Sequence, residues 1–455
     1  MNIVSQNHET SNSISQNLQN FCKRFGLYKL LSRFGASKTK GISFVQVFDF
    51  LMGLVFTGKN LYRTTITGGM SMSKDTVHRF LKNAQIHWEK ILQILAASVI
   101  QKLRPLTGED RLTAIVVDDS PYYRNRSKKV ELLSKQFDHV FKKFFMGFRM
   151  LTLGFTDGNT FIPFASQLMA SQNTENPTEK LMDKRTLAAR RRKNAMKTMP
   201  ERLYELLKTA KAMKVPARHV LFDSWFSNPI TLITIKNIGY SCVAMLKKGK
   251  TKYQYDGKLL NLSEIFKRIK KRPGRSKYLA SVSVSVVHSE TKQTTEAKIV
   301  FVRDRKNRKK WCALISTDVL LSEEEIIQLY GKRWDIEVFF KMCKSYLKLA
   351  KEFEGRSYDM MTAHTSIVFI RYICLAWTRR ESEDPRCFGE LFYFFCDELQ
   401  DISFKLALEL LLSTLVETIH DSLFLPEEKM ADLLDSFFAK LPESYSNLRK
   451  CHCES

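Results

Sequence analysis

Apolar residues recur at helical spacing over the first 108 residues of the chain. The clearest stretches are Phe44–Phe56 and Trp88–Leu103, in which apolar side chains return every three to four residues. Between them, Ser73–Lys82 combines a Ser/Asp start with a short basic amphipathic segment. This segment fits the second helix of a helix-turn-helix unit or, more commonly, an ordinary surface helix. The pattern predicts an N-terminal region built of helices.

The pattern becomes strand-like from Arg111 onward. Thr113–Val117 is a continuous apolar run that stops at Asp118-Asp119-Ser120, and Arg218–Phe222 is a second run that stops at Asp223. Three strands in a meander, followed by strands that alternate with helices, predict a mixed α/β sheet covered on both faces. The other predicted elements are strands at Phe145–Phe155, Thr160–Phe164 and Tyr240–Leu246, a turn at Asp157-Gly158-Asn159, and a charged helical stretch at Glu179–Met213.

A β-rich stretch then interrupts the α/β pattern. Ala280–His288 and Lys298–Arg303 are strand-like, and the main pattern resumes with a strand at Trp311–Ser316. A long helix is expected from Ser322, which forms a capping box with Glu325. The expected regions are a helical N-terminal region at 1–108, the first part of the sheet domain at 109–247, a β-rich insertion at 248–310, the second part of the sheet domain at 311–380, and an acidic helical tail at 381–455.

Charge is distributed unevenly along the chain. The first 380 residues carry 67 Lys and Arg against 31 Asp and Glu, whereas the last 75 carry 6 against 16. A basic body of this size attracts polyanions, so a nucleic-acid partner is favoured over a basic protein without one. Charge alone does not separate DNA from RNA or anionic lipid. Arg190–Lys193 suits contacts to a DNA backbone and equally suits a solvated helix face.

Composition excludes several classes of protein. With 44% hydrophobic and 26% charged residues, the chain can bury a core and is not disordered throughout. Nine scattered cysteines without a CxxC pair, and no export signal, indicate reduced thiols in a cytoplasmic protein. No window of about 18 residues is free of charge, so no membrane span or membrane partner is expected. A phosphate-cradling GxxxxGK[ST] motif is missing from the sequence, so ATP use is not indicated.

Two of the predicted strands end in aspartate. Functional groups in α/β sheets gather at the carboxyl ends of strands, so Asp118 and Asp223 form either separate strand caps or a paired-carboxylate metal site. Asp119 is an alternative to Asp118 as the first ligand. Because successive strand residues face opposite sides of a sheet, only one of the two can face Asp223. We favour Asp118, which directly follows the apolar run.

The helix expected after Ser322 carries a third acid. Four residues of this helix, spaced at 0, 3, 7 and 14 from the first of them, fall on one side at about 100° per residue and form a stripe. One more cation lies beside this stripe. A solvated face would more often mix the signs of charge, and a core face would be apolar. One acid among an aromatic side chain and cations suits a metal-dependent reaction on a phosphodiester. The stripe is Tyr330, Arg333, Glu337 and Lys344, and the neighbouring cation is Lys341.

The spacing Tyr330-(2)-Arg333-(3)-Glu337-(6)-Lys344 matches the Y-(2)-R-(3)-E-(6)-K signature of DDE transposases of the insertion-sequence 4 group. The strands before Asp118 and Asp223 resemble those that carry the family's first and second aspartate, so the resemblance spans residues 110–350. It implies an RNase H-like core in which Asp118, Asp223 and Glu337 bind two Mg²⁺ or Mn²⁺ ions. It also implies phosphate contacts by Tyr330, Arg333 and Lys344, and we add Lys341 to the expected DNA-binding set.

The same resemblance implies cleavage at the inverted repeats of a transposon and joining of the ends to double-stranded target DNA. We expect a homodimer in the synaptic complex, working in the bacterial cytoplasm at the nucleoid. The main alternative is a DNA-binding regulator whose catalytic core has decayed. A further alternative, a glycosidase that uses paired acids, would leave the basic charge of the first 380 residues unexplained. Trp225, just after Asp223, is more often a core residue than a platform for an extruded base.

Overall fold

The computed structural model describes most of residues 16–396 and, beyond them, residues 419 and 436 only. The chain divides into two units, Met1–Phe395 and Cys396–Ser455, and the fold is that of the first. Most of the expected acidic tail, including Cys451-His452-Cys453, lies outside the described residues. The gaps in the described range are 38–40, 67–71, 109–110, 139–140, 175, 178–182, 274–275, 289, 305–306, 308–309, 354, 382, 384–386 and 389.

Five strands form the centre of a mixed sheet in the order β4-β3-β1-β5-β6. β1 and β4 are both antiparallel to β3, whereas β5 is parallel to β1 and to β6. Three antiparallel strands followed by two parallel ones are the arrangement of an RNase H-like core, so the predicted fold class is confirmed. The strands are β1 (Ala114–Tyr123), β3 (Lys143–Thr156), β4 (Phe161–Met169), β5 (His219–Phe222) and β6 (Ser241–Leu246), and β2 (Ser134–Asp138) pairs with the start of β3.

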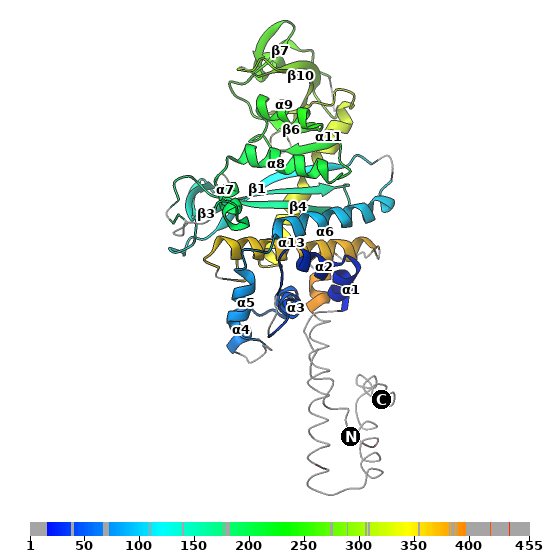
Figure 1. Ribbon diagram of the computed structural model, residues 1–455. Helices are drawn as coiled ribbons and strands as arrows, with labels where there is room; N and C mark the ends of the chain where they lie inside the picture. The colour runs from blue at the N-terminus through cyan, green and yellow to red at the C-terminus, as the bar shows by residue number, and fades with distance from the viewer. Residues whose placement is uncertain are drawn as a thin grey trace. The chain divides into compact units, whose positions relative to one another are not determined.

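The β-rich stretch extends the same sheet. β11 (Trp311–Ser316) is antiparallel to β6, and the sheet continues through β10, β9, β7 and β8. These strands form the upper part of the unit in Figure 1. Their bounds are β7 (Lys252–Tyr255), β8 (Lys258–Asn261), β9 (Ala280–Val287) and β10 (Thr294–Arg303), with α10 (Leu262–Arg268) between β8 and β9.

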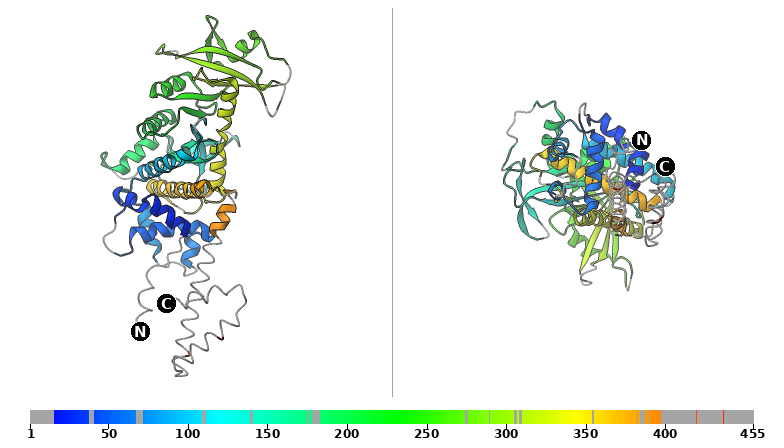
Figure 2. Two further views of the ribbon diagram at one scale, coloured as in Figure 1. Left: turned by 90° about the vertical axis from the view of Figure 1, so that its right-hand side faces the viewer. Right: turned by 90° about the horizontal axis from the view of Figure 1, so that it is seen from below.

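Helices cover both faces of the central strands (Figure 2). α8 and α9 pack on one face, and α11 and α12 run along the other, from the β-rich strands toward α13. α13 and α6 both pack against β4, and the N-terminal helices lie beyond them (Figure 1). The bounds are α7 (Leu187–Ala195), α8 (Met199–Ala212), α9 (Pro229–Ile238), α11 (Glu323–Gly331), α12 (Trp334–Ser345) and α13 (Tyr358–Glu381).

The N-terminal region is helical, as its hydrophobic spacing predicts. The segment Ser73–Lys82, considered above as the second helix of a helix-turn-helix unit or as a surface helix, forms α5. Thr76, Val77 and Leu81 of this helix are buried against the helices around it. Its N-cap is the Ser73 hydroxyl, which accepts the N–H of Thr76. The helices are α1 (Gln16–Arg24), α2 (Leu27–Arg33), α3 (Phe44–Leu54), α4 (Leu61–Ile66), α5 (Lys74–Leu81) and α6 (Trp88–Leu103), with short 3₁₀ turns at Val55–Thr57 and Arg104–Leu106.

α13 is the central helix of the unit. It is long and apolar enough to span a membrane by length and composition, but 94% of its most apolar 18-residue stretch, the apolar window, is buried inside the protein. Arg371, the charge that interrupts this window, is fully buried and ion-paired with Glu352 at 2.7 Å. It also donates to the carbonyls of Leu51 and Met52 in α3. A core helix that binds the N-terminal region through a buried cation accounts for this composition.

Two predictions about individual elements are wrong. β1 does not stop at Asp118 but continues to Tyr123, because β3 pairs with it along its whole length. The helix after Ser322 is not continuous: α11 ends at Gly331 and α12 begins at Trp334. Lys332, in the turn between them, donates to the carbonyls of Leu112 and Asp157, so the turn is anchored to the sheet. Glycine, a poor helix former, stands at the break.

Candidate active site

The register of the sheet brings Asp118 and Asp223 to the same level. β1 and β5 run parallel with Val116 opposite Leu221, and each aspartate lies two residues further along its strand. Aligned residues of adjacent parallel strands share a face, so both carboxylates belong to the same side of the sheet. Asp223 follows the last residue of β5, and its Oδ1 accepts the N–H of Trp225 at 2.9 Å. Asp223 lies close enough to Asp118 to raise its pKa, just beyond the last paired residues of β1 and β5.

Asp119 belongs to the opposite face. Its carboxylate is ion-paired with Arg149 of β3, whose guanidinium also donates to the carbonyl of Phe137 at 2.9 Å. The Asp119 side chain is only 6% exposed. The pleat of β1 therefore separates the two neighbouring acids, and Asp118 is the one that faces α12.

The turn between α11 and α12 directs Arg333 to two acids. Its Nη1 lies 3.2 Å from Oδ2 of Asp118, and its Nη2 donates to Oε1 of Glu337, one helical turn further along α12. Tyr330, at the end of α11, is mostly buried beside the same guanidinium. Arg333 thus bridges a carboxylate of the sheet and a carboxylate of the helix.

A second cation from α12 reaches β1. Lys344 Nζ donates to Oγ of Ser120 at 2.6 Å, two residues beyond Asp118 on the same face. Lys341 is exposed on α12, and no contact links it to the acids within the described part of the chain. The break between the helices therefore preserves most of the expected stripe: Tyr330, Arg333, Glu337 and Lys344 gather at the sheet, and Lys341 points to solvent.

Burial and neighbouring acids shift the pKa values of the side chains in this cluster. Burial, with Asp119 and Asp223 nearby, raises the pKa of Asp118 to about 7, although Arg333 acts in the other direction. Burial likewise raises the pKa of Tyr330 to about 12. Burial lowers the pKa of Lys344, and Asp138 and Asp118 only partly offset it. The cluster combines crowded acids with partly desolvated cations, which is typical of functional sites.

Two exposed tryptophans flank the acids. Trp225, two residues after Asp223, is 47% exposed and meets Phe226 edge-on, so its expected role as a core residue is wrong. Trp334 opens α12, three residues before Glu337, and is 63% exposed. Sequence reasoning missed Trp334 because an aromatic residue at the start of an amphipathic helix fits a core position equally well. It also missed Ser120, which a strand ending at Asp118 would have excluded.

Arg190–Lys193 does not present four cations to solvent. Arg191 and Arg192 are buried and ion-paired with Asp359, and Arg192 also pairs with Glu131 at 2.5 Å. Arg190 and Lys193 are exposed. Half of this basic run is therefore internal, where it joins α7 to the start of α13.

Comparison with known proteins decides the family. A model of the DDE superfamily of endonucleases matches residues 49–311, more than half of the chain. The chain belongs to this superfamily. The matched stretch contains Asp118 and Asp223, whereas Glu337 and the rest of the helical stripe lie beyond it.

The remaining comparisons add little to the description of this DDE endonuclease. Its sequence matches no curated protein. Among solved structures, it is similar to a chain described as "Drosophila P element transposase strand transfer complex", with 9% identity and a TM-score of 0.21. The match covers 55% of each chain, so the endonuclease spans about half the length of that neighbour. A likeness this slight carries no argument about function.

Nucleases of the DDE superfamily use divalent metal ions, and the acids of this endonuclease suit such an ion in chemistry. Three carboxylates offer the hard oxygen donors that Mg²⁺ and Mn²⁺ prefer. Among the described residues, however, no three acidic, His or Cys side chains are placed to hold an ion as they stand. The positive charge between Asp118 and Glu337 is that of Arg333. An ion held by both Asp118 and Glu337 would have to displace Arg333 from them.

Proposed function

We propose that this DDE endonuclease is a transposase of the insertion-sequence 4 type. It would bind the inverted repeats of its own element and catalyse metal-dependent cleavage and strand transfer into target DNA. The observation that carries the proposal is the bridge from Asp118 through Arg333 to Glu337, at the level of Asp223. In support, Arg333 of the signature contacts Asp118, one of the two aspartates proposed from the ends of the predicted strands. We further propose a homodimer in the synaptic complex and action at the bacterial nucleoid.

The proposed ligands are Asp118, Asp223 and Glu337, holding two Mg²⁺ or Mn²⁺ ions. When bound, such ions activate the attacking oxygen and stabilise the leaving oxygen of a phosphodiester. The pairing of Asp119 with Arg149 supports Asp118 as the first ligand. The donors around the acids have a separate role: Tyr330, Arg333 and Lys344 would hold backbone phosphates beside the scissile bond, and Lys341 would contact the DNA further along α12.

Substitution of the three acids tests the proposal. Asp118→Asn, Asp223→Asn and Glu337→Gln should each reduce Mg²⁺-dependent nicking of end DNA by more than the 10–100-fold loss typical of residues outside the metal shell. Binding of the same DNA in Ca²⁺ should stay within about threefold of the original protein. Asp119→Asn is the matched control, because it removes an adjacent carboxylate from the other face of the sheet.

Two results would contradict the assignment. Normal nicking by the Glu337→Gln protein would remove Glu337 from the site. A loss caused by Asp119→Asn but not by Asp118→Asn would transfer the first ligand to Asp119. Specific DNA binding without any metal-dependent product in the original protein would favour the decayed regulator.

A further inference from the structure

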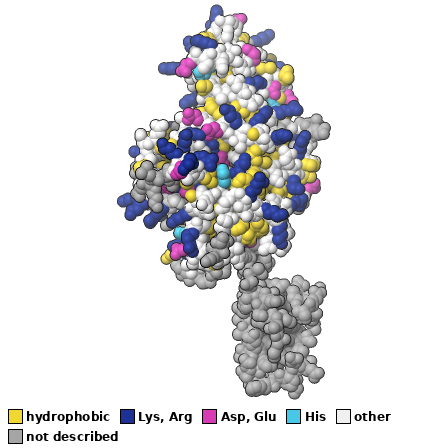
Figure 3. Space-filling model, in the orientation of Figure 1, with side chains coloured by type: hydrophobic (Ala, Val, Ile, Leu, Met, Phe, Trp, Pro, Cys, Tyr) yellow, Lys and Arg dark blue, Asp and Glu magenta, His cyan; other side chains and the backbone are white. Residues whose placement is uncertain are grey.

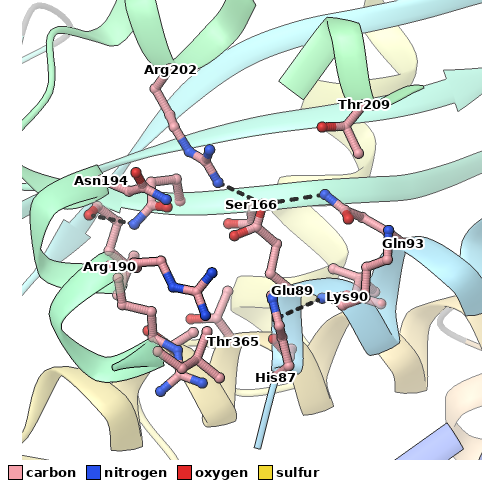
Figure 4. A pocket seen from close by; sticks show the side chains of 17 residues that line it. His87, Glu89, Lys90, Gln93, Ser166, Arg190, Asn194, Arg202, Thr209 and Thr365 are labelled. Carbon is pink, nitrogen blue, oxygen red and sulfur yellow. Dashed lines mark hydrogen bonds and ion pairs between the residues drawn. The ribbon is translucent and has the colours of Figure 1, made fainter. Parts of the chain in front are cut away.

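A polar cavity of about 260 Å³ lies two strands away from Asp118, beside β4. Asp118 is paired with Thr152 of β3, and Thr152 is paired with Ser166 of β4, whose side chain borders the cavity. Among the described strands β4 pairs only with β3, so its other edge is free. α6, α7, α8 and α13 close the space around that edge (Figure 4).

The lining of this cavity is strongly basic. Four cations border it, together with His87, whose pKa is lowered by burial, and Glu89 is the single acid among its lining residues. Glu89 is already paired with Arg202 at 2.5 Å and accepts a hydrogen bond from Gln93 at 3.2 Å. The cavity thus keeps an excess of positive charge after its own ion pairs are counted. The cations are Lys90, Arg190, Arg191 and Arg202.

Two of these cations have no anionic partner in the described part of the chain. Arg191 is held by Asp359 and by backbone carbonyls, whereas no ion pair involves Lys90 or Arg190. Arg190 is exposed on α7. Basic side chains gather on the face of the unit drawn in Figure 3, over the region where Figure 1 labels α7. Arg190 lies at the rim of the cavity, so a ligand that arrives from solvent meets a free guanidinium first.

Two residues that line the cavity also have a buried donor without a partner. Within the described residues, the Oγ of Ser166 and the Nε of Arg202 are both buried and hydrogen-bonded to nothing. The Arg202 side chain is only 6% exposed, and its terminal nitrogens are occupied by Glu89 and Glu205. Buried polar atoms in folded proteins almost always have a partner, so an unpartnered N–H and hydroxyl at one cavity point to a missing acceptor.

We propose that this cavity binds a phosphate monoester. Such a group carries a charge of about −1.5 to −2 and three acceptor oxygens, which matches two free cations and two unpartnered donors. The volume is close to the lower end of the about 300–1,000 Å³ that small-molecule sites occupy, so there is room for more than the phosphate itself. A single nucleotide and the 5′-phosphate end of a DNA strand present the same chemistry. The proposal does not depend on the metal site.

Calorimetry at constant ionic strength tests this site. Deoxyadenosine 5′-monophosphate should bind the full-length protein, whereas deoxyadenosine should not, and inorganic phosphate should compete. The double variant Lys90→Gln/Arg190→Gln should weaken binding of the monophosphate at least tenfold. Lys193→Gln, which removes an exposed cation from the same helix but outside the cavity, should leave the affinity unchanged. Equal binding of nucleoside and nucleotide, or equal loss in the Lys193 variant, would overturn the proposal.

A second variant tests the interior of the cavity. Ser166→Ala removes a hydroxyl that makes no hydrogen bond within the described residues, so it should leave the thermal midpoint nearly unchanged while weakening phosphate binding severalfold. An unchanged affinity would contradict the assignment of Ser166. Matched duplexes with a 5′-phosphate or a 5′-hydroxyl then identify the source of the phosphate. If the double variant loses preference for the phosphorylated end, the ligand is a DNA end; if neither protein has that preference but both bind mononucleotide as expected, the ligand is a free nucleotide.

Discussion

Removing the Arg333 guanidinium should tighten metal binding while it weakens catalysis. In the DNA-free protein this guanidinium is shared between Asp118 and Glu337, so an ion at the proposed site would have to compete with it for both carboxylates. Arg333→Gln keeps a polar side chain of moderate length but removes the charge. The proposed contact to a DNA phosphate is lost in the same variant, so nicking should decrease even though the metal site is easier to fill.

The magnitude follows from the two contacts. A hydrogen bond to a charged group contributes about 1.5–3 kcal/mol, and the lower end applies here because the side chains of Arg333, Asp118 and Glu337 are 18%, 18% and 33% exposed. Part of this free energy is recovered when Arg333 turns to solvent. If Arg333 opposes the ion by a net free energy of about 1.5–3 kcal/mol, its removal should raise the Mn²⁺ affinity roughly 10–140-fold.

Mn²⁺ titration followed by electron paramagnetic resonance measures this change without DNA and without turnover. Arg149→Gln is the matched control, because Arg149 is paired with Asp119 on the opposite face, and its loss should leave the Mn²⁺ affinity within about twofold. Arg333→Met, which also lacks the charge, should behave like Arg333→Gln. Unchanged or weaker Mn²⁺ binding in both Arg333 variants, with unchanged thermal midpoints, would refute the idea that Arg333 competes with the ion.

Three further outcomes follow from other parts of the structure. Trp334→Ala should weaken binding of end DNA by about 5–100-fold through lost base stacking while leaving stability unchanged. Fluorescence anisotropy measures the affinity, and equal affinities of the variant and the original protein would contradict this prediction. Arg371→Met should lower the free energy of unfolding by about 3–5 kcal/mol because the buried Glu352 loses its arginine and keeps, among the described residues, only His364 beside it. Urea titration measures this change, and added Glu352→Gln should restore part of the lost stability. Burial raises the pKa of Asp49 to about 6, above its unfolded value, so ionisation of Asp49 costs stability as pH rises from about 4 to 6. Asp49→Asn should therefore stabilise the protein by about 1–2 kcal/mol at pH 7.5 and have little effect at pH 4, and a gain of equal size at both pH values would contradict this reasoning.

The fold could be predicted because its signals are local and repeated. Apolar, β-branched runs before Asp118 and Asp223 identify two strands, and helical spacing identifies the N-terminal region. The bounds of the helices and strands were harder to predict, since they depend on partners elsewhere in the chain. β1 continues through Asp118-Asp119-Ser120 because β3 supplies hydrogen bonds along that stretch, although polar residues there suggest an end.

The sequence predicted which residues form the helical stripe, but not the break between α11 and α12 that interrupts the helix. Periodicity at about 100° per residue assumes one straight helix. The stripe stays on one side here because Lys332 and Arg333, in the turn, both keep right-handed helical backbone angles. The break follows Gly331, where Lys332 donates to the carbonyls of Leu112 and Asp157. Such tertiary contacts leave no periodic trace in a sequence.

Burial of charge was the least predictable property. Arg191 and Arg192 follow Arg190 in a polar stretch, which reads as solvated, yet both are internal because Asp359 and Glu131 supply partners from distant parts of the chain. Lys90 and Arg190 reach the cavity beside β4 from different helices, and Ser166 reaches it from a strand.

The pleat of β1 connects these observations. Asp118 faces the α12 side, and the pairing of Thr152 with Asp118 and of Ser166 with Thr152 continues that face across two strands. Asp119, one residue along, is paired with Arg149 on the other face. A shift of one residue in the register of β1 would exchange these environments, placing Asp119 beside Arg333 and removing Asp118 from it. Because the Lys344–Ser120 and Arg333–Asp118 contacts both involve even-numbered residues of β1, they act together to hold the register in which three distant acids can share one site.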